Sequence, residues 1–518
     1  MNTAVAPGRD SEFMPLHEQL TAAFRRHADR EALLAGDNSI TFAELDRAVD
    51  TMCVPLRAQG LGPGRRLAIM AKARPQFVVA LLATLRLGAA VVLVSPAWKG
   101  QEIRHAVALT RPMMVASDHD TLGLFAAEFD GPALDLDVIT VPDAQSAANG
   151  TGARCFPEHG HEWAGAEAAH VFSSGTTGLP KAVVHTHGTL GAATRDWARH
   201  GLDLTESDRF QIATPPAHIL GLLNIFAALS SGSTIRLHPR FNVDEMLRCI
   251  EADRLTLEMT IAPIALALAE HPDLEQFDLS SLRYFMWCAT PVVSSVAQSV
   301  TDRTGVRFVA AYGASEFPLI SANIPTAADT WRIDTAGRVI EHVDVRVVDT
   351  ESGDVLALGE TGEIQARGRS MMIGYLPQEA TAGSIVDGWY RTGDIGWLEP
   401  DGWLHITDRL KEMIKVKGFQ VAPAEVEAVI LNHPRVVDCA VFGVPDQATG
   451  EAVIAAVVAA SGQPVTTVEL QQHVVATLAK YKVPNRVEFI DAIPRTASGK
   501  VLRRTLRERL ATGTGQRG

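Results

Sequence analysis

Short apolar segments that can form strands alternate with helix-forming segments through much of the chain. Residues 67–70 and 89–94 are apolar segments of this kind, and the stretch 75–87 between them suits a buried helix. A strand, a helix and a second strand in this order favour a parallel sheet covered by helices. Similar alternation returns over residues 209–311. We therefore predict an α/β fold with a large N-terminal body of helix-covered sheets.

Local signals refine this prediction near the N-terminus. Residues 1–20 carry no clear pattern and are expected to form a loose arm. Residues 40–60 suit a short strand followed by a helix, because Thr41 is a good N-cap and Glu44 lies in the first turn.

The pattern changes after about Ala336. Residues 343–348, 361–367 and 403–407 are short strand candidates separated by Gly, Asp and Pro, which predicts a mostly antiparallel β subdomain. A helix candidate at 424–432 and strand candidates at 438–444 and 452–458 follow. We predict an N-terminal domain over 1–408 and a small, mobile α+β domain over 409–518.

Composition excludes several classes of protein. The 518 residues, 47% of them hydrophobic, can bury more than one core. The formal net charge of −13 argues against a nucleic-acid partner, although an anionic substrate can still bind a local positive site. The five cysteines are scattered and form no CxxC pair, which disfavours a disulfide framework or a zinc site.

The sequence also indicates no membrane segment. Residues 77–95 are strongly apolar, but Arg86 and Gly88 interrupt them, so a helix that turns into a strand fits better than a membrane span. Residues 1–12 lack a basic segment followed by an apolar one, which argues against a signal peptide. We expect a cytoplasmic protein without stable membrane association, and the oligomeric state, monomer or homodimer, stays open.

Residues 173–181 form a loop rich in glycine and hydroxyl side chains that follows a strand candidate at 170–172. Two glycines let successive backbone N–H groups face one point, hydroxyls add donors, and Lys181 adds a cation, a set that suits a polyphosphate. The spacing is not that of a Walker loop. An ordinary surface loop is the alternative on composition alone.

The longer string SSGTTGLPKAVVHTHGTL resembles the signature loop of the acyl-adenylate-forming superfamily, which includes acyl- and aryl-CoA ligases, nonribosomal adenylation domains and firefly luciferase. The resemblance extends over about residues 20–505 and implies ATP, Mg²⁺ and a carboxylic acid as ligands, with CoA as cosubstrate. In this loop it implies ATP binding by Ser173, Ser174, Gly175, Thr176, Thr177, Gly178 and Lys181.

A second segment, AYGASE, resembles the family's QGYGxTE pattern. By that match the Tyr312 ring stacks on adenine, the Ser315 hydroxyl contacts the α-phosphate, and Glu316 holds magnesium. Ala310 and Ala311 depart from the usual Gln and Gly. Without the other segments this string would be an ordinary turn.

Two later segments match the family around the ribose and the domain boundary. In YRTGD, Asp394 would accept hydrogen bonds from both ribose hydroxyls. In DRLKEMIKVKG, Arg409 would approach the ribose and Lys411 would be the hinge. Lys415 and Gly418 would lie on the face that meets CoA during thioester formation.

The string PRTASGK near the C-terminus matches the family's adenylation lysine. By that match Lys500 bridges the carboxylate of the acid and the α-phosphate, where its compact charge offsets the developing negative charge. The residues expected to act in catalysis are Lys500, Thr177, His218 and Glu316.

The segment PPAHILG resembles the family's PxFHxxG and places His218 beside the carboxylate. Relatives that activate amino acids carry an aspartate near this point, and its absence argues against an α-amino acid. Cys288 replaces the glycine that many relatives have in an SGAAP-like string and is expected to narrow the pocket. The resemblance assigns the acid pocket to His218, Gly221, Trp287, Cys288, Ala289, Gly313 and Phe317.

The sequence thus predicts ATP-dependent activation of an apolar acid (aryl, cinnamyl-like or medium-chain) and transfer of its acyl group to CoA. One alternative is another acceptor, either a carrier-protein phosphopantetheine or an amine that reacts with an activated small acid such as nitrite. A second alternative is an inactive binding protein. The intact Lys181, Asp394 and Lys500 disfavour the latter.

Overall fold

The computed structural model of the chain describes residues 14–139, 163–173, 180–213, 215–323, 325, 331–417, 419–446, 449–460, 462, 464–496 and 499–512. The chain divides into two compact units. The first contains Met1–Phe241, Ser315–Leu319 and Gly368–Ala382, and the second contains Asn242–Ala314, Ile320–Arg367 and Gly383–Gly518. Each unit is described by itself.

A seven-stranded mixed sheet organises the first unit, with the strand order β18-β8-β7-β4-β3-β5-β6. The pairs β7–β4, β4–β3, β3–β5 and β5–β6 are parallel, whereas β8 is antiparallel to both β7 and β18. The strands are β3 Arg66–Met70, β4 Ala90–Leu93, β5 Met114–Ser117, β6 Ala133–Asp135, β7 Glu167–Ser173, β8 Lys181–Thr186 and β18 Gly374–Leu376.

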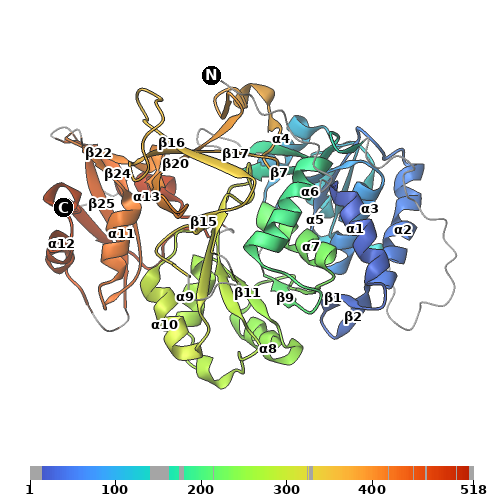
Figure 1. The fold of residues 1–518 in the computed structure, drawn as a ribbon, viewed down its shortest axis with the longest axis horizontal. Coiled ribbons are helices and arrows are strands. Elements are labelled where there is room, and N and C mark those ends of the chain that lie inside the picture. The colour runs from blue at the N-terminus through green and yellow to red at the C-terminus, as the bar shows by residue number, and fades with distance from the viewer. Residues whose placement is uncertain are drawn as a thin grey trace. The chain divides into compact units, whose positions relative to one another are not determined.

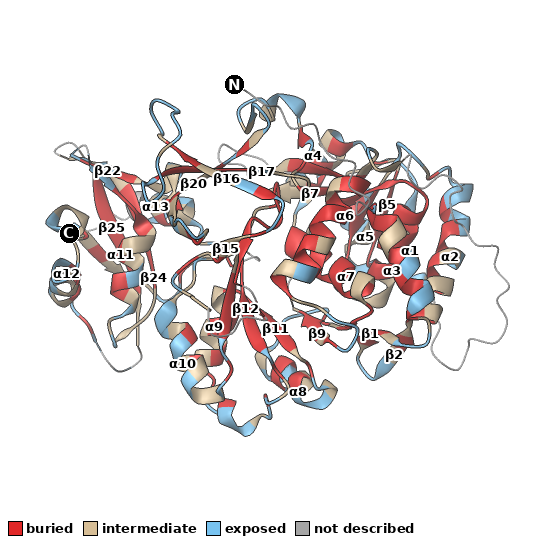
Figure 2. Cartoon of the chain, viewed as in Figure 1, coloured by how far each residue is buried: buried red, intermediate tan, exposed pale blue. Residues whose placement is uncertain are grey.

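The apolar run that sequence analysis divided into a helix and a strand has that structure. Helix α3 spans Pro75–Arg86 with proline in its first turn, and strand β4 follows. Both are buried along almost their whole length (Figure 2). The uniform apolar character of the run therefore reflects a central position in the unit, as expected of a parallel strand and its crossover helix.

The expectation of a loose arm over residues 1–20 is wrong where the structure describes them. Helix α1 spans Leu16–Arg26 and already includes four of those residues before Leu20. Leu16, Leu20, Ala23 and Phe24 recur at helical spacing and are buried, while Arg25 and Arg26 close the last turn. The amphipathic period, rather than a cap, marks this helix, because Pro15 at its start offers no side-chain acceptor.

The other helices and a smaller sheet complete the first unit. Helices α1, α2 and α3 lie side by side (Figure 1). Thr41 caps α2 as predicted: its Oγ1 accepts from the Glu44 N–H at 3.2 Å, and the Glu44 carboxylate accepts from the Thr41 N–H at 2.7 Å. The sheet β2-β1-β10-β9 contains β1 Glu31–Ala35, β2 Asn38–Thr41, β9 Arg209–Ile212 and β10 Thr234–Leu237. The remaining helices are α2 Phe42–Ala58, α4 Gly100–Thr110, α5 His119–Ala126, α6 His187–Asp196 and α7 Ile219–Ser231.

The second unit begins with another α/β layer, which confirms the alternation predicted for this region. Its sheet has the order β11-β12-β13-β14-β15, in which β11, β12 and β13 are parallel. The strands are β11 Leu257–Thr260, β12 Tyr284–Trp287, β13 Phe308–Tyr312, β14 Ser321–Ala322 and β15 Arg338–Val339. The helices are α8 Val243–Asp253, α9 Ala262–Ala269 and α10 Ser294–Thr304.

An antiparallel β region follows, as predicted from the short strand candidates separated by Gly, Asp and Pro. Strands β17, β19, β20 and β21 pair antiparallel through β20, and β16 borders β17. The strands are β16 Val343–Val348, β17 Gly362–Gly368, β19 Ile385–Val386, β20 Trp389–Leu398 and β21 Leu404–Arg409. The predicted domain boundary at Asp408 falls at the end of β21 and stays a prediction.

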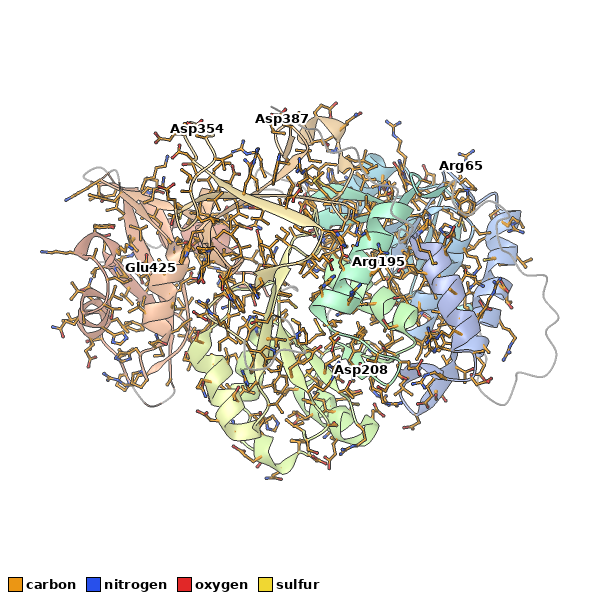
Figure 3. The ribbon with its side chains drawn as sticks, viewed as in Figure 1. Arg65, Arg195, Asp208, Asp354, Asp387 and Glu425 are labelled. Carbon is orange, nitrogen blue, oxygen red and sulfur yellow. The ribbon has the colours of Figure 1, made fainter. Side chains whose placement is uncertain are left out.

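The C-terminal region is a small α+β layer with both sheet faces covered. Strand β24 alternates its side chains between two cores: Cys439 and Val441 belong to one, and Ala440 and Phe442 to the other. Glu425, which Figure 3 labels on α11, is paired with Lys482 at 2.6 Å. The elements are β22 Ile414–Val416, β23 Phe419–Val421, β24 Val436–Asp446, β25 Gly450–Ala459, β26 Arg486–Phe489, α11 Pro423–Leu431, α12 Thr467–Val475 and α13 Arg503–Thr512. Among the described residues, none of the helices has the length and apolar character needed to cross a membrane.

Candidate active site

The predicted site residues are distributed over both units. The first unit holds Ser173, Lys181, His218, Gly221, Ser315, Glu316 and Phe317. The second holds Trp287, Cys288, Ala289, Tyr312, Gly313, Asp394, Arg409, Lys411, Lys415 and Lys500. Ser174, Gly175, Thr176, Thr177, Gly178 and Gly418 lie outside the described residues.

The two ends of the predicted phosphate loop are fixed by a strand pair. Ser173 is the last residue of β7, Lys181 is the first residue of β8, and the two are opposite each other in the antiparallel register. The carbonyl of Pro180 lies 2.8 Å from His105 Nε2, a hydrogen bond that holds the loop's C-terminal end to helix α4. The two described ends of the predicted loop therefore lie on adjacent strands of the seven-stranded sheet.

Glu316, the predicted metal ligand, is nearly buried and is oriented by a tyrosine. Its Oε1 accepts a 2.7 Å hydrogen bond from the hydroxyl of Tyr375 on β18, and its backbone carbonyl accepts from the Met372 N–H at 2.8 Å. The Tyr375 ring lies 5.2 Å from the Lys181 Nζ. The structure thus brings the predicted phosphate-loop lysine and the predicted metal ligand to one tyrosine.

The ligand chemistry at Glu316 fits magnesium. In the described parts of the chain, no group of three or more His, Cys, Asp or Glu side chains is placed to hold a metal ion. A single carboxylate with an uncommitted second oxygen suits Mg²⁺, which commonly takes one or two protein carboxylates together with phosphate oxygens and water. Glu316 would hold the ion together with the nucleotide rather than within a protein cage.

The backbone around Ser315 is held by a buried histidine. His185 Nε2 lies 2.8 Å from the Ser315 carbonyl, and His185 Nδ1 lies 3.2 Å from Thr189 Oγ1. Burial lowers the pKa of His185, so the ring is neutral and donates to the carbonyl. Phe317, predicted to line the acid pocket, is fully buried in this unit.

His218 and Gly221 form the start of helix α7. His218 is the N-cap, and its Nδ1 accepts from the Leu220 N–H at 3.4 Å. A side chain at Gly221 would place its Cβ 2.5 Å from the carbonyl oxygen of Pro215 and 2.9 Å from Cα of Pro216. Only glycine lets the first turn of α7 approach this segment, so Gly221 fixes the position from which the His218 side chain projects.

In the second unit, Tyr312 at the end of β13 and Arg409 at the end of β21 meet Asp394, which lies in the middle of β20. Asp394 and Arg409 are opposite each other on β20 and β21, and Asp394 Oδ1 lies 2.8 Å from Arg409 Nε. The Tyr312 hydroxyl, at the end of β13, donates to Asp394 Oδ2 at 2.5 Å. Thr392 supports the carboxylate, because its Oγ1 accepts from the Asp394 N–H at 3.0 Å.

This group of three contains one fixed charge pair and one neutral donor. Desolvation and the nearby Asp394 carboxylate raise the pKa of Tyr312 well above its usual range, so its hydroxyl stays protonated. The Asp394 side chain is 5% exposed and that of Arg409 is 43% exposed. A nearly buried carboxylate with two acceptor oxygens, open on the arginine side, can exchange these donors for the two hydroxyls of a ribose.

The predicted pocket residues at the end of β12 and directly after it are packed among protein side chains. Trp287 is 1% exposed, its ring centroid lies 5.6 Å from that of Phe308, and its Nε1 donates to Thr290 Oγ1 at 3.1 Å. Cys288 donates its backbone N–H to the Thr260 carbonyl at 3.2 Å, and burial raises the pKa of its thiol to about 12. Ala289 has φ +63°, a left-handed conformation that turns the chain immediately after the strand. Their contact with an acid, and that of Gly313, stays a prediction.

Lys411 and Lys415 are exposed residues on either side of Met413. Lys411 lies in a short 3₁₀ turn after β21, and Lys415 is the middle residue of β22. The Lys415 N–H donates to Glu451 Oε2 at 2.7 Å, which fixes the strand that carries it. Their predicted hinge and CoA-facing roles stay predictions.

Lys500 projects from a tight turn. The Thr496 N–H donates to the Lys500 carbonyl at 2.8 Å, and the Lys500 N–H donates to Thr496 Oγ1 at 3.1 Å. Gly499 has φ +82°, and a Cβ there would lie 2.9 Å from Cδ of Pro263. The turn that carries Lys500 therefore packs against the start of helix α9 at a point where only glycine fits.

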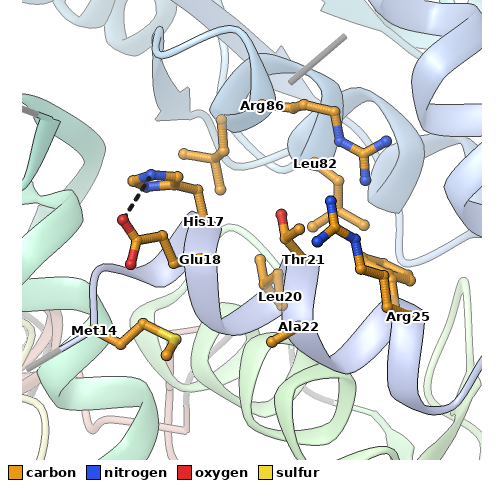
Figure 4. Close-up of a pocket in the computed structure, with 11 residues that line it drawn as sticks. Met14, His17, Glu18, Leu20, Thr21, Ala22, Arg25, Leu82 and Arg86 are labelled. Carbon is orange, nitrogen blue, oxygen red and sulfur yellow. Dashed lines mark ion pairs between the residues drawn. The ribbon is translucent and has the colours of Figure 1, made fainter. Parts of the chain in front are cut away.

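One cavity in the first unit lies away from these residues. It has a volume of about 360 Å³ and is lined mainly by α1 and α3, with His17, Glu18 and Arg25 among its residues (Figure 4). A smaller cavity of about 350 Å³ lies beside α8 and α9 in the second unit. Neither contains a residue that sequence analysis assigned to the site, so volume alone does not identify the chemistry.

Sequence reasoning missed Tyr375 and Thr392. Tyr375 lies in the string GYLP, where a tyrosine beside glycine and proline indicates only a turn or an edge strand. Thr392 directly precedes the Gly393-Asp394 pair, and its hydroxyl could have been recognised as a local acceptor for the aspartate N–H.

Comparison with known proteins identifies the family. Residues 20–376 match the family model of the AMP-binding enzyme, and residues 425–500 match that of the AMP-binding enzyme C-terminal domain. The chain belongs to this family and is an adenylate-forming enzyme of the acyl/aryl-CoA ligase type. ATP, Mg²⁺ and CoA are the cofactors that CoA ligases of the family use.

Among curated relatives, the chain is similar to 4-coumarate–CoA ligases. It is 31% identical to one from Humulus lupulus, over 96% of this chain and 94% of the relative. It is 34% identical to another from Oryza sativa subsp. japonica, over 96% of this chain and 93% of the relative.

Solved structures share the fold. The ATP-bound MatB of Rhodopseudomonas palustris has a TM-score of 0.87 and 27% identity, over 96% of this chain and 99% of that one. The amide bond synthetase McbA of Marinactinospora thermotolerans has a TM-score of 0.84 and 30% identity, over 96% of this chain and 100% of that one.

Proposed function

We propose that this enzyme activates an apolar carboxylic acid as its acyl-adenylate and then transfers the acyl group to CoA. The observation that supports the nucleotide part best is the group formed by Tyr312, Asp394 and Arg409. A nearly buried carboxylate that already accepts two donors matches the two adjacent hydroxyls of a ribose. The tyrosine ring at the same point offers a surface for adenine.

In the first half-reaction, the residues bind and orient charge. A carboxylate oxygen of the acid attacks the α-phosphorus in line, a P–O bond forms, and the bond to pyrophosphate breaks. Lys181 and the loop 173–181 bind phosphate oxygens, and Lys500 bridges the attacking carboxylate and the α-phosphate. Glu316 would hold Mg²⁺ together with the nucleotide, and the bound ion would neutralise charge on the phosphates.

In the second half-reaction, the small domain changes its position. We propose that residues 409–518 rotate about Lys411, which withdraws Lys500 and brings the strand with Lys415 and Gly418 to the site. The CoA thiolate then attacks the acyl carbon, and AMP leaves. One site serves two reactions in this scheme because the two sets of residues alternate.

The proposed acid is aryl, cinnamyl-like or medium-chain. Identities of 31–34% to 4-coumarate–CoA ligases over 96% of the chain support an arylpropenoic acid as the first substrate to test. The segment around His218, residues 215–221, contains no acidic side chain that could pair with a substrate ammonium, which favours an acid without an α-amino group.

A panel of acids tests this proposal. Purified enzyme is incubated with Mg·ATP and each acid, with and without CoA, and AMP, acyl-AMP and acyl-CoA are followed by mass spectrometry. We expect AMP formation that depends on the acid, and acyl-CoA only when CoA is present. Absence of AMP with every aryl and medium-chain acid would overturn the proposal.

A second candidate acceptor is an amine. The specific observation in its favour is the 30% identity to the amide bond synthetase McbA over 96% of this chain. The same panel with amines in place of CoA distinguishes the two: amide formation faster than thioester formation would make the enzyme an amide synthetase. A phosphopantetheinylated carrier protein is a third arm of that panel.

A further inference from the structure

Tyr375 lies between two charged residues that the proposed reaction needs. It is the middle residue of β18 and is opposite Val183 on β8. Directly opposed residues of an antiparallel pair share one face of the sheet, and so does Lys181, two residues from Val183. This register explains why the Tyr375 ring lies 5.2 Å from the Lys181 Nζ while its hydroxyl reaches Glu316 Oε1 at 2.7 Å.

The backbone on both sides of Tyr375 is fixed. Its N–H donates to Thr381 Oγ1 at 2.9 Å, and the Ile373 N–H donates to the Val184 carbonyl at 3.0 Å. Gly374 has φ +152°, and a Cβ there would lie 2.9 Å from Thr381 Oγ1. The tyrosine therefore enters the site from a rigid edge strand, and its ring has little freedom to move away.

The ring and hydroxyl keep two opposite charges apart. Within the described residues, Lys181 and Glu316 form no ion pair within 4.0 Å, although both contact the same side chain. A direct pair between this ammonium and this carboxylate would compete with phosphate and metal for both groups. Instead the ammonium rests on the ring, and the hydroxyl occupies one carboxylate oxygen.

We propose that Tyr375 is a positioning residue for adenylation: it holds Glu316 ready for magnesium and keeps Lys181 available for the triphosphate. The inference rests on the proposed function, since it assigns the metal and the phosphates to that same site. Tyr375 acts through Glu316 and Lys181 and contacts no reacting atom.

Two substitutions separate the two contacts of Tyr375. Tyr375→Phe removes the hydroxyl hydrogen bond and keeps the ring beneath Lys181, whereas Tyr375→Leu removes both. For Tyr375→Phe we expect about tenfold more Mg²⁺ for half-maximal pyrophosphate release, because one hydrogen bond to a charged group is lost. For Tyr375→Leu we expect an additional rise in KM for ATP. Thioester formation from supplied acyl-AMP should be unchanged in both variants.

A double-mutant cycle tests whether Tyr375 acts through Glu316. If it does, Tyr375→Phe should change the Mg²⁺ requirement of the wild type but not that of Glu316→Gln. Tyr284→Phe is the matched control, because it makes the same substitution at a fully buried tyrosine away from the predicted site. Tyr284 lies at the start of β12, and the predicted pocket residue Trp287 lies at the opposite end of that strand. An Mg²⁺ requirement of Tyr375→Phe within twofold of wild type, with an unchanged melting temperature, would overturn the inference.

Calorimetry of Mg·ATP binding makes the test independent of the acid. If the wild type binds Mg·ATP but forms no adenylate with any acid, the proposed function fails, and weaker Mg·ATP binding by Tyr375→Phe still supports the inference. Equal Mg·ATP binding by both proteins contradicts the inference whatever the acid panel shows. If Tyr375→Phe does not fold, Mg·ATP binding is compared between the wild type and Glu316→Gln. Unchanged binding overturns the inference, because Glu316 would then not bind the metal and Tyr375 would have no metal ligand to orient.

Discussion

At the scale of single residues, Asp394 is the clearest test of nucleotide binding. Asp394→Asn keeps the shape but replaces one acceptor oxygen with a donor and removes the charge that pairs with Arg409. We expect KM for ATP to rise about 10- to 100-fold, the range for losing a hydrogen bond to a charged group. The wild type should also prefer ATP over 2′-deoxy- and 3′-deoxy-ATP, and the variant should lose that preference. A variant that discriminates against both deoxynucleotides as the wild type does would exclude Asp394 from ribose binding.

His187 is one of the buried residues whose titration should lower stability in acid. The ring is fully buried, and neither nitrogen has a hydrogen-bond partner among the described residues. Burial, together with the neighbouring His17, lowers the pKa of His187 to about 3. Because the unfolded chain binds a proton near pH 6.5 and the folded chain does not, stability falls as the pH drops from about 6.5 towards 3.

The variant His187→Leu tests whether titration of His187 lowers the stability of the protein in acid. One such group makes the free energy of unfolding fall by at most about 1.4 kcal/mol for each pH unit in that window. The leucine variant should lose this pH dependence while its stability at pH 8 stays the same. Urea unfolding at several pH values measures it. His119→Leu is the control, because His119 is 79% exposed, and it should leave the acid slope in place. Parallel curves for wild type and His187→Leu would assign acid sensitivity elsewhere.

At the scale of elements, the first turn of α7 depends on Gly221. An alanine there would bring Cβ to 2.5 Å from the Pro215 carbonyl, so backbone rather than a flexible side chain must move. We expect Gly221→Ala to lower stability by about 1–3 kcal/mol, the usual effect of overpacking, and to raise KM for the acid because the His218 cap moves with the turn.

Gly123→Ala is the matched control for that element. Gly123 lies in helix α5, and a Cβ there would meet nothing within 4 Å. Since alanine favours helix over glycine by about 1 kcal/mol, this variant should be as stable as the wild type or more so, with unchanged KM. The melting temperature and the KM for the acid substrate are measured for both variants. Equal values for Gly221→Ala and Gly123→Ala would contradict the proposed role of Gly221.

At the scale of the whole molecule, Lys500 separates the two half-reactions. Within its own domain the turn is fixed by the hydrogen bonds between Thr496 and Lys500, which suits a lysine delivered as part of a moving domain. Lys500→Ala should abolish acyl-AMP formation and spare acyl-CoA formation from supplied acyl-AMP. Pyrophosphate release and thioester formation are measured separately. An equal loss of both steps would contradict alternation of the small domain.

The sequence by itself determined the family and the alternation of elements, and it predicts which residues bind the ligands. Strings such as SSGTTGLPK and PRTASGK can be recognised from the sequence because each consists of consecutive residues, which are necessarily close together in the folded chain. The burial of α3 and β4 was equally readable, since a uniformly apolar run has few other places in a folded chain.

Only the tertiary structure decided what lies beside each of these groups. Tyr375 reaches Glu316 from a strand 59 positions later, and Tyr312 meets Asp394 across 82 positions, contacts that depend on sheet register and leave no periodic signal. The arm predicted for residues 16–20 is wrong for a different reason: Leu16, Leu20, Ala23 and Phe24 do recur at helical spacing, but no side-chain cap marks where that helix begins. The functional groups of each motif can be identified from the sequence, whereas the orientation and desolvation of these groups depend on side chains that only folding brings together.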